Sequence, residues 1–274
     1  MSEMWNSVAL GWEENAQFVD DHLAPATESL LDAASIGEGD AVLELATGPG
    51  GAGLAAARRV GQHGTVLLSD VAEQMVAVAA RRSSGQPQVK TAVFDQDDIA
   101  AENGSFDAVI SRHGLMFVED TVAAVREGVR VLRPGGRYAA MTWGPREANP
   151  WLGLVLDAVG EQFGIPFPPP GIRGPFSLED AEVLASLLRR GGLTDVAVTV
   201  IETPMPAPSL QAWWERVPKL AGPLAQALEG MEPEIRESIR QRALGAAEHI
   251  VRKVGKQIEF PGRVLVASGS NPYQ

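Results

Sequence analysis

The sequence predicts an α/β protein built on a parallel β-sheet with helices on both faces. In the stretch Ala41–Arg58, a short apolar run breaks into a glycine-rich turn, and an alanine-rich helix follows. Beyond this stretch, apolar runs typical of strands alternate with helical patterns and are joined by short links. Strands that alternate with helices form parallel sheets, because each connecting helix packs back onto a face of the sheet. With 274 residues, 45% of them hydrophobic, the chain can bury one large core or two small ones.

Two helices are expected within residues 1–40, before the glycine-rich turn. The second begins at Pro25, whose missing N–H would have no partner in the first turn of a helix anyway. Leu30, Leu31 and Ala34 then recur at helical spacing. A glycine-containing turn leads from this helix into the first strand.

The core elements that follow are recognised by their apolar patterns and by the residues at their ends. Arg81 and Arg82 end one helix, where cations complement the helix dipole. Asp120 can cap the next helix, which the stretch Arg133–Gly136 stops. Strands are predicted over residues 41–45, 64–70, 89–94, 106–111 and 137–143, and helices over residues 72–82 and 121–132.

The second half of the chain is less regular. Residues 144–176 are rich in proline and aromatic side chains. A helix is predicted over residues 177–190 with Ser177 as its cap, because a serine oxygen can accept hydrogen bonds from the first N–H groups of a helix. Strands are predicted over residues 194–201 and 263–268, and helices over residues 209–229 and 233–253.

The composition excludes several classes of protein. The net charge of -12 disfavours binding to nucleic acid or to an anionic membrane, since both need basic patches. The chain has no cysteine, so disulfides and thiolate chemistry are excluded. We recognise neither an apolar signal segment nor an apolar run long enough to cross a bilayer. A soluble, cytoplasmic protein is therefore expected, and its oligomeric state stays open.

The turn Gly48–Gly53 satisfies the glycine pattern of dinucleotide-binding sites. Glycine lets the backbone turn tightly and approach a ligand closely, and the helix that follows directs unpaired N–H groups at whatever lies above the turn. Asp70 lies about 20 residues further on, where an acid that binds a ribose is expected. Alone, the pattern leaves open both a nucleotide-type cofactor site and a turn that uses glycine only for its geometry.

Four blocks of sequence carry a resemblance to a known family. In order, they are VLELATGPGG, LLSDVAEQM, FDQDDIAAENGSFDAVISRHGLMF and VLRPGGRYAAMTW. They resemble the class I S-adenosylmethionine-dependent methyltransferases, and most of all the small-molecule branch related to the ubiquinone/menaquinone C-methyltransferases, which is type 11 methyltransferase-like. The resemblance covers residues 41–143. It implies a Rossmann-like, seven-stranded, mostly parallel sheet in the order 3-2-1-4-5-7-6, with helices on both faces and helical substrate-cap insertions.

The resemblance also implies one methyltransferase domain over residues 1–274. Within the N-terminal segment, Trp5 and Trp12 would close over the cofactor. The long second half argues against a quinone precursor as the acceptor. By expected role, the parts are a helical lid at 1–37, a cofactor-binding core at 38–143, substrate-cap insertions at 144–176 and 208–254, and segments completing the sheet at 177–207 and 255–270.

The cofactor that the resemblance implies is S-adenosylmethionine, with S-adenosylhomocysteine as the product. Glu44 would attract the ammonium group, Asp70 would accept both ribose hydroxyls, and Asp95 would bind the exocyclic amine of the adenine. The alternative for Glu44 is that it caps the adjacent turn. Ala46 departs from the family, which usually has glycine at this position. The expected cofactor-binding residues are Trp12, Glu44, Ala46, Thr47, Gly48, Gly50, Asp70, Val71, Met75, Asp95, Gln96 and Ser111.

Methyl transfer needs mainly the alignment of a nucleophile with the donor, plus removal of a proton when the nucleophile is a hydroxyl. His113 follows the fourth strand, where this fold faces the donor methyl group, and a histidine pKa near 6.5 suits a general base. The alternative is that His113 packs against the cofactor or hydrogen-bonds a backbone carbonyl. His22, His63 and His249 are interpreted as ordinary surface or helix residues.

The substrate is expected in an apolar, aromatic pocket formed by the two insertions. For each aromatic residue the alternative is plain core, and for Arg112 it is an internal ion pair. Ser111–Gly114 lacks the Asp/Asn-Pro-Pro-aromatic block of enzymes that methylate amino groups of nucleic acids, and no oxygen-ligand set for magnesium is evident, so no metal is expected. The expected substrate-binding residues are Arg112, Met116, Trp143, Asn149, Trp151, Phe167, Trp213 and Trp214.

The sequence thus predicts a methyltransferase that moves a methyl group from S-adenosylmethionine to an O, N or C nucleophile of a small aromatic or polyketide-like metabolite. Two alternatives stay open. The first is an NAD(P)-dependent oxidoreductase, in which Glu44, the loop at Asp95 and the turn Arg133–Gly136 would have no role. The second is a protein that binds S-adenosylmethionine without transferring its methyl group.

Overall fold

Seven strands form the central sheet of the computed structural model, which describes residues 2–272. The strands lie in the order β3-β2-β1-β4-β5-β10-β6, and β10 runs antiparallel to both of its neighbours. With β10 as the seventh strand, the expected order 3-2-1-4-5-7-6 is confirmed. Three residues of the expected domain, Met1, Tyr273 and Gln274, lie outside the described residues. The strands are β1 (Ala41–Leu45), β2 (Thr65–Asp70), β3 (Val89–Val93), β4 (Phe106–Arg112), β5 (Leu132–Trp143), β6 (Thr194–Glu202) and β10 (Arg263–Ser270).

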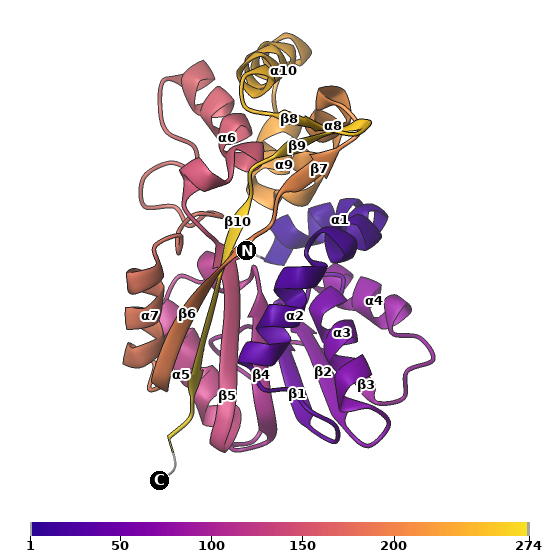
Figure 1. Ribbon diagram of the computed structural model, residues 1–274, viewed down its shortest axis with the longest axis vertical. Coiled ribbons are helices and arrows are strands. Elements are labelled where there is room, and N and C mark those ends of the chain that lie inside the picture. Colours follow the sequence, from indigo (N-terminus) through magenta and orange to yellow (C-terminus); the bar gives the residue numbers. More distant parts are fainter. Residues whose placement is uncertain (1, 273–274) are drawn as a thin grey trace.

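Helices cover both faces of this sheet, because successive strand residues point to opposite sides and both sides are apolar (Figure 1). In β1, Val42 and Leu43 belong to two different buried clusters. The cluster around Val42 includes residues of α2 (Ala24–Ala33), α3 (Gly51–Val60) and α4 (Glu73–Arg82). The cluster around Leu43 includes residues of α5 (Thr121–Val131) and α7 (Ala181–Arg190).

Aspartates cap two of these helices. Asp120 accepts a hydrogen bond from the Ala123 N–H at 2.9 Å, which confirms the expected cap of α5. The prediction for α7 was wrong at its start, because Asp180 is the cap and accepts hydrogen bonds from two first-turn N–H groups. Ser177 instead accepts a hydrogen bond from the Gly174 N–H at 2.8 Å. The charged carboxylate thus takes the first-turn N–H groups, and the helix starts at Ala181.

Strand β5 begins at Leu132, which was predicted to end the preceding helix, and it includes the stretch Arg133–Gly136, which was predicted to be a turn. Leu132 pairs with Phe106 of β4, and the register shifts before Arg137 pairs with Ala108. Gly135 lies in this shift with φ +79°, a conformation that favours glycine. The glycine pair therefore forms an irregularity inside the strand, and the predicted start at Arg137 was wrong.

A cap with its own buried cluster sits above the carboxyl ends of the parallel strands (Figure 1). The helix predicted over residues 209–229 divides at Ala221, because Pro223 follows and starts a new helix. The helix predicted over residues 233–253 ends at Glu248, and its last residues belong to a strand. The cap elements are α6 (Pro150–Phe163), α8 (Leu210–Leu220), α9 (Gly222–Glu229), α10 (Pro233–Glu248), and a second sheet of β7 (Met205–Ala207), β9 (Gln257–Phe260) and β8 (Arg252–Val254).

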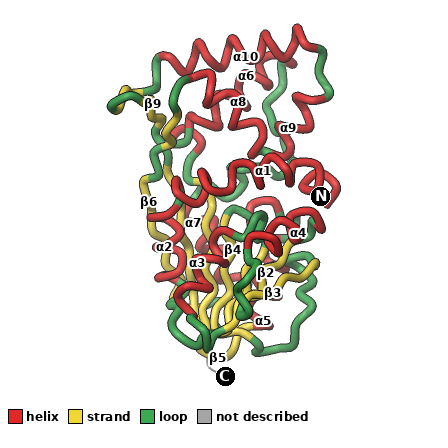
Figure 2. The backbone as a smooth tube through the Cα atoms, turned by 90° about the vertical axis from the view of Figure 1, so that its right-hand side faces the viewer, coloured by secondary structure: helices red, strands yellow, loops and turns green. Residues whose placement is uncertain are grey.

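Helix α1 (Ser2–His22) lies between the sheet and the cap (Figure 2). Glu13 of this helix pairs with Arg81 of α4 at 2.7 Å, and Glu14 pairs with Lys219 of α8 at 3.3 Å. One helix is therefore fastened to both the central sheet region and the cap.

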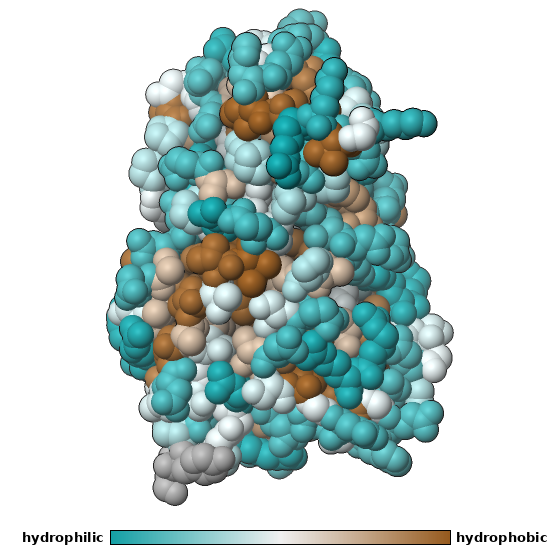
Figure 3. All heavy atoms as spheres, in the orientation of Figure 1, coloured by the Kyte–Doolittle hydropathy of each residue, from teal (hydrophilic) through white to brown (hydrophobic). Residues whose placement is uncertain are grey.

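The outer surface is largely hydrophilic on the face that Figure 3 shows, with separate apolar patches. No helix within residues 2–272 combines the length and the apolar character needed to cross a membrane.

Candidate active site

A cavity lies where the strands of the central sheet end, between the sheet, α1 and the cap. It contains about 1320 Å³ of empty space, part of it open to solvent. Loops after β1 to β3 and Met75 of α4 form one end. The rest is formed by residues of α1, α6, α8 and α9, by the loop after β4, and by Trp143 of β5 and Met205 of β7. Of the residues expected in a site, it is lined by Trp12, Ala46, Thr47, Gly48, Asp70, Val71, Met75, Asp95, Gln96, Arg112, His113, Met116, Trp143 and Trp151.

Two glycines shape the turn after β1 in different ways. Gly48 has φ +52°, and a Cβ added there would meet no atom within 4 Å, so this part of the backbone borders open space. Gly50 has φ +87° and caps α3, but it does not line the cavity. A Cβ on Gly50 would lie 3.2 Å from Leu68, so its absence lets the turn pack closely against β2.

Asp70 ends β2 with its carboxylate at the cavity wall. Oδ2 accepts a hydrogen bond from the Gly48 N–H and Oδ1 accepts one from the Ala72 N–H, each at 2.9 Å. A carboxylate oxygen has about two lone-pair sites, so each oxygen keeps one for a ligand. Burial raises the pKa of Asp70, and the backbone N–H groups oppose this shift.

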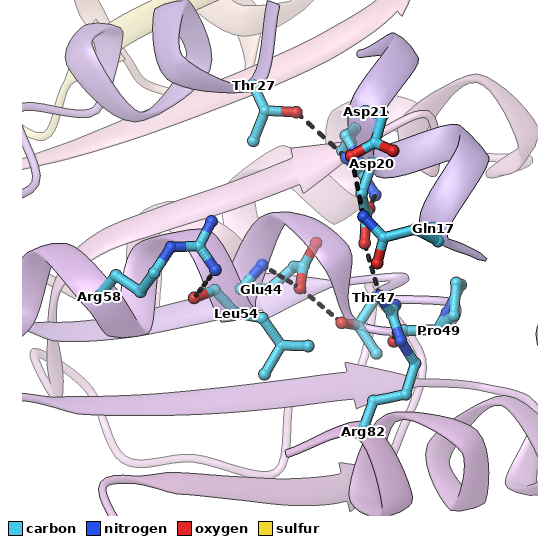
Figure 4. A network of polar contacts seen from close by, with 12 residues as sticks. Gln17, Asp20, Asp21, Thr27, Glu44, Thr47, Pro49, Leu54, Arg58 and Arg82 are labelled. Carbon is cyan, nitrogen blue, oxygen red and sulfur yellow. Dashed lines mark hydrogen bonds and ion pairs between the residues drawn. The ribbon is translucent and has the colours of Figure 1, made fainter. Parts of the chain in front are cut away.

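Glu44 lies buried beneath the turn and does not line the cavity. Its Oε2 accepts hydrogen bonds from the Thr47 hydroxyl and from the Gly53 N–H (Figure 4). A Cβ on Gly53 would lie 2.5 Å from the same oxygen, which accounts for a glycine there. Burial raises the pKa of Glu44 to about 7, against the opposing effects of Arg112 and these hydrogen bonds. This is the geometry of a residue that caps the turn, and its contact with a cofactor ammonium stays a prediction.

Asp95 and Gln96 line the cavity just after β3. Asp95 Oδ1 accepts a hydrogen bond from the Gln96 N–H at 2.7 Å. The side-chain oxygen of Gln96 accepts one from Ser111 Oγ at 3.4 Å. Ser111 is fully buried and lies outside the lining, so in this structure it supports Gln96 from behind.

Ala46 occupies a backbone conformation that favours glycine, with φ +51°. A Cβ on Gly114 would lie 2.3 Å from the Ala46 Cβ, which is far closer than two carbon atoms can approach. Gly114, which follows β4, therefore leaves the space that the Ala46 methyl group occupies. The departure from the family glycine at residue 46 is accommodated by a glycine at residue 114.

His113 stacks on Trp143, with ring centroids 3.9 Å apart and an interplanar angle of 14°. Trp143 in turn meets Trp151 edge-on at 4.9 Å. Both ring nitrogens of His113 are buried and have no hydrogen-bond partner among the described residues. Burial lowers the pKa of His113 well below 6.5, and Arg112 and His22 add to this shift. The ring is therefore neutral at pH 7, and the expectation of an ordinary histidine pKa was wrong.

Arg112 lines the cavity, but its guanidinium group is held inside the fold. It donates to Thr27 Oγ1 at 3.1 Å and to Asp20 Oδ1 at 3.0 Å. The other oxygen of Asp20 accepts from Arg82 at 2.6 Å, and Arg82 also donates to the Pro49 carbonyl at 2.7 Å (Figure 4). One carboxylate of α1 thus ties that helix to β4 and α4. This is an internal ion pair, and a contact between Arg112 and a substrate stays a prediction.

The residues expected in the substrate pocket that do not line the cavity are Asn149, Phe167, Trp213 and Trp214. Asn149 is fully buried, and its amide exchanges hydrogen bonds with the backbone N–H and carbonyl of Arg263, both at 2.9 Å. It therefore joins the start of α6 to β10. Trp213 donates to the Trp151 carbonyl at 2.8 Å inside the cap cluster, and the other two pack at the edge of that cluster.

Helix α1 supplies a larger part of the cavity wall than the sequence analysis expected. Trp5, Trp12 and Val19 all line the cavity. They recur every seven residues, which places them on one face of the helix. That spacing is the signal that could have identified the wall.

His22, at the end of α1, also lines the cavity, so its interpretation as an ordinary surface or helix residue was wrong. Its Nε2 is buried and has no hydrogen-bond partner within residues 2–272. Burial lowers the pKa of His22 to about 4, and the positive charges of Arg112 and Arg216 act in the same direction. His22 is therefore neutral at pH 7, like His113.

The glycine-turn end of the cavity fits a molecule with an amino-acid end, a ribose and an adenine. Gly48 offers open backbone, and Asp70 keeps lone pairs for hydroxyl groups. Val71 and Met75 provide apolar surface for a flat ring, and Asp95 provides an acceptor for an amine. The residues present thus suit S-adenosylmethionine.

Comparison with known proteins agrees with this fit. The profile of the methyltransferase domain family matches residues 42–136. The nocamycin O-methyltransferase of Saccharothrix syringae is 31% identical over 204 residues, which are 69% of this chain and 71% of that protein. The ubiquinone/menaquinone biosynthesis C-methyltransferase of Azotobacter vinelandii is 28% identical over 60% of this chain and 66% of that one. The chain spans only 31% to 48% of the length of several other curated relatives that it matches.

A solved structure shows the same fold at low sequence identity. It is the phosphoethanolamine N-methyltransferase 2 of Haemonchus contortus in complex with S-adenosylmethionine, with 18% identity and a TM-score of 0.55 over 91% of this chain and 53% of that one. The match to the Saccharothrix protein exceeds 30% identity and extends over more than two thirds of that protein. The chain therefore belongs to the class I S-adenosylmethionine-dependent methyltransferases.

Proposed function

We propose that the protein is an enzyme that transfers a methyl group from S-adenosylmethionine to an O, N or C nucleophile of a small aromatic or polyketide-like molecule. The observation that carries this proposal is one cavity with two unlike ends. Gly48 and Asp70 line one end, and Trp143 and Trp151 line the other. Direct transfer requires donor and acceptor in one enclosed space, with the reacting atoms in line.

At the glycine-turn end, the chain holds the donor. When bound, S-adenosylmethionine supplies an activated methyl group, and S-adenosylhomocysteine is the product. Asp70 accepts hydrogen bonds from the ribose hydroxyls with the lone pairs that Gly48 and Ala72 leave free. Val71 and Met75 pack against the adenine, and Asp95 accepts a hydrogen bond from its amine.

The N-terminal helical segment, residues 1–37, acts as a lid in this proposal, and the insertions at 144–176 and 208–254 act as the substrate cap. Trp5 and Trp12 of the lid close over the cofactor, and the cap covers the acceptor. Together they exclude water, which strengthens polar interactions at the reacting atoms.

His113 lines this cavity and can take a proton from a hydroxyl acceptor. Its lowered pKa makes it a weak base, so it suits an acceptor whose hydroxyl is acidic.

A small-molecule acceptor is favoured over nucleic acid by the net charge of -12. The names of two relatives, an O-methyltransferase of nocamycin and a C-methyltransferase of ubiquinone and menaquinone biosynthesis, support the same class.

Two measurements test the proposal. Isothermal titration calorimetry is expected to show binding of S-adenosylhomocysteine and no binding of NAD. Incubation with methyl-labelled S-adenosylmethionine and a metabolite extract is expected to give a labelled small molecule, and mass spectrometry would identify it. Preference for NAD would contradict the cofactor, and binding without any labelled product would identify a protein that holds S-adenosylmethionine for another purpose.

A further inference from the structure

Unpartnered polar atoms gather along the cavity. Among the described residues, six buried side-chain nitrogen or oxygen atoms have no hydrogen-bond partner, and four of them belong to Trp12, His22 and His113. All three residues line the cavity. Buried polar groups in proteins almost always have partners, because leaving one unpaired costs free energy. Such a concentration beside one cavity points to a ligand that supplies the missing partners once the buried nitrogens turn toward the cavity.

The two histidines are suited to an uncharged partner. A neutral imidazole has one N–H donor and one nitrogen acceptor, so each ring can receive a hydrogen bond from a hydroxyl. Arg112 and Arg216 disfavour a positive charge on His22, and Arg112 does the same for His113. Burial disfavours a charge on either ring even more strongly, and a cationic acceptor would meet the same cost of losing its hydration.

A permanently anionic acceptor also lacks a partner at this end. Arg112 lines the cavity, but it already donates to Asp20 and Thr27. Arg216 does not line the cavity, and its guanidinium group stacks on the ring of Phe18 at 3.7 Å. A carboxylate or phosphate would lose its hydration and find only a guanidinium whose charge is already paired with Asp20.

The remaining wall at this end is apolar. It includes Phe18, Trp143, Trp151, Leu152, Met205 and Val217, and none of these carries a charge. Such a surface suits a flat ring, which it binds by burial and by aromatic packing.

We propose that His22 and His113 together bind the methyl acceptor, and that this acceptor is an uncharged ring compound whose phenol or enol hydroxyl donates a hydrogen bond to the His22 imidazole. This inference rests on the proposed function and extends it to the chemical class of the acceptor. It assigns to His22 a role in acceptor binding.

Three naphthalene probes with the same ring test the proposal: 2-naphthol, 2-naphthoate and 2-naphthylmethylammonium. Their dissociation constants are measured by calorimetry at pH 7 with the whole protein saturated with S-adenosylhomocysteine. We expect 2-naphthol to bind at least tenfold more tightly than either charged probe. Equal or tighter binding of a charged probe, or no binding of 2-naphthol, overturns the proposal.

Variants of His22 test the hydrogen bond itself. His22→Phe keeps a flat ring but removes the nitrogen atoms, and it is expected to weaken 2-naphthol binding about fivefold, the value of one uncharged hydrogen bond. His22→Gln places an amide near the Nε2 position and is expected to restore binding. With 2-methoxynaphthalene, which has no hydroxyl to donate, His22→Phe is expected to have no effect. His249→Phe, at an exposed histidine outside the cavity, is the matched control.

Binding of S-adenosylhomocysteine separates failure of this inference from failure of the proposed function. It is measured first in the unaltered protein and in each variant, where it also reports that the variant is folded. If the unaltered protein does not bind it, the proposed function is wrong. If every variant binds it but His22→Phe leaves 2-naphthol binding unchanged, only the inference about the acceptor is wrong.

Discussion

The two ends of the cavity differ in how their polar groups are satisfied. At the glycine-turn end, Asp70 and Asp95 accept hydrogen bonds from backbone N–H groups at 2.7 to 2.9 Å. At the aromatic end, His22 and His113 have ring nitrogens without a partner among the described residues. The first end is a set of groups that the fold itself holds in position, and the second is a set that finds no partner among the described residues.

This difference shows how one cavity can combine polar groups held in one orientation with a surface that makes few directional contacts. Hydrogen bonds to the backbone hold a carboxylate in one orientation before a ligand arrives, which lowers the entropic cost of binding. Stacked rings such as His113 and Trp143 contribute area and shape but few directional contacts. The glycine-turn end is therefore preorganised by the fold, whereas the aromatic end offers mainly surface and shape.

The largest expected effect is at the fixed end, in Asp70→Asn. The variant loses the negative charge that strengthens both hydrogen bonds to the ribose, and its NH2 group replaces one of the two oxygens that accept from the Gly48 and Ala72 N–H groups. We expect S-adenosylhomocysteine to bind roughly 1000-fold more weakly, which corresponds to about 4 kcal/mol. Calorimetry measures this, with Asp97→Asn in the exposed loop as the control. Unchanged affinity would show that Asp70 does not hold the ribose.

The next effect concerns Glu44, whose folded pKa of about 7 lies above its ordinary value of 4.5. The raised pKa means that protonated Glu44 stabilises the fold. This contribution to the unfolding free energy is full below pH 4.5 and is lost as the pH rises through 7. Glu44→Gln keeps an acceptor for Thr47 and Gly53 but does not titrate. We therefore expect the difference in unfolding free energy, variant minus unaltered protein, to rise by up to about 3 kcal/mol between pH 5 and pH 8.

Urea unfolding at several pH values measures this difference. His22 and His113 have lowered pKa values and give a slope of the opposite sign, but they are common to both proteins and cancel in the comparison. Glu38→Gln, at an exposed carboxylate, should show no such pH-dependent gain. A pH-independent difference for Glu44→Gln would mean that Glu44 is ionised throughout.

A smaller effect is expected at the floor between the two ends, in Gly114→Ala. The new Cβ would lie 2.3 Å from the Ala46 Cβ, and overpacking of this kind costs about 2 kcal/mol of unfolding free energy. The double variant with Ala46→Gly removes this contact and is expected to recover most of the loss. Chemical denaturation of the four proteins gives the coupling energy. Additive effects would show that the two residues do not share this space.

The smallest effect is that of Ala46→Gly alone. Release of the strained φ of +51° stabilises the folded state, and the greater freedom of glycine in the unfolded chain offsets part of the gain. A net gain of about 1 kcal/mol in unfolding free energy is expected from thermal or urea unfolding. Gly48→Ala, at φ +52° in open space, is the matched reverse change and should lose a similar amount. A loss of stability in Ala46→Gly would contradict strain at this position.

The pattern of the first half of the chain predicted the fold well, since strand, glycine turn and helix each have a local signal. Asp70 was singled out because it lies about 20 residues after the glycine turn, where an acid that binds a ribose is expected. The cap was predicted less well. The strands β8 and β9 are too short for a periodic pattern, and the break between α8 and α9 depends on a proline near Ala221.

The aromatic residues of the second half show why the pocket could not be predicted residue by residue. Trp151 lines the cavity, and Trp213 donates to its carbonyl from inside the cap cluster. Both are apolar residues on amphipathic segments, and a pocket and a core need the same side chains. Only the packing of distant segments decides which ring faces empty space. His22 was missed for the same reason, because its neighbours Arg112 and Arg216 are far away in the sequence.

Helix α1 touches both ends of the cavity, with Trp12 toward Met75 and Phe18 in contact with the cap. In the proposed reaction, α1 therefore borders both the methyl donor and the acceptor. An outward movement of α1 would expose both molecules at once, so we expect the exchange of donor and acceptor to be coupled. The ion pairs of Asp20 with Arg82 and Arg112 hold α1 in place and would have to break in such a movement.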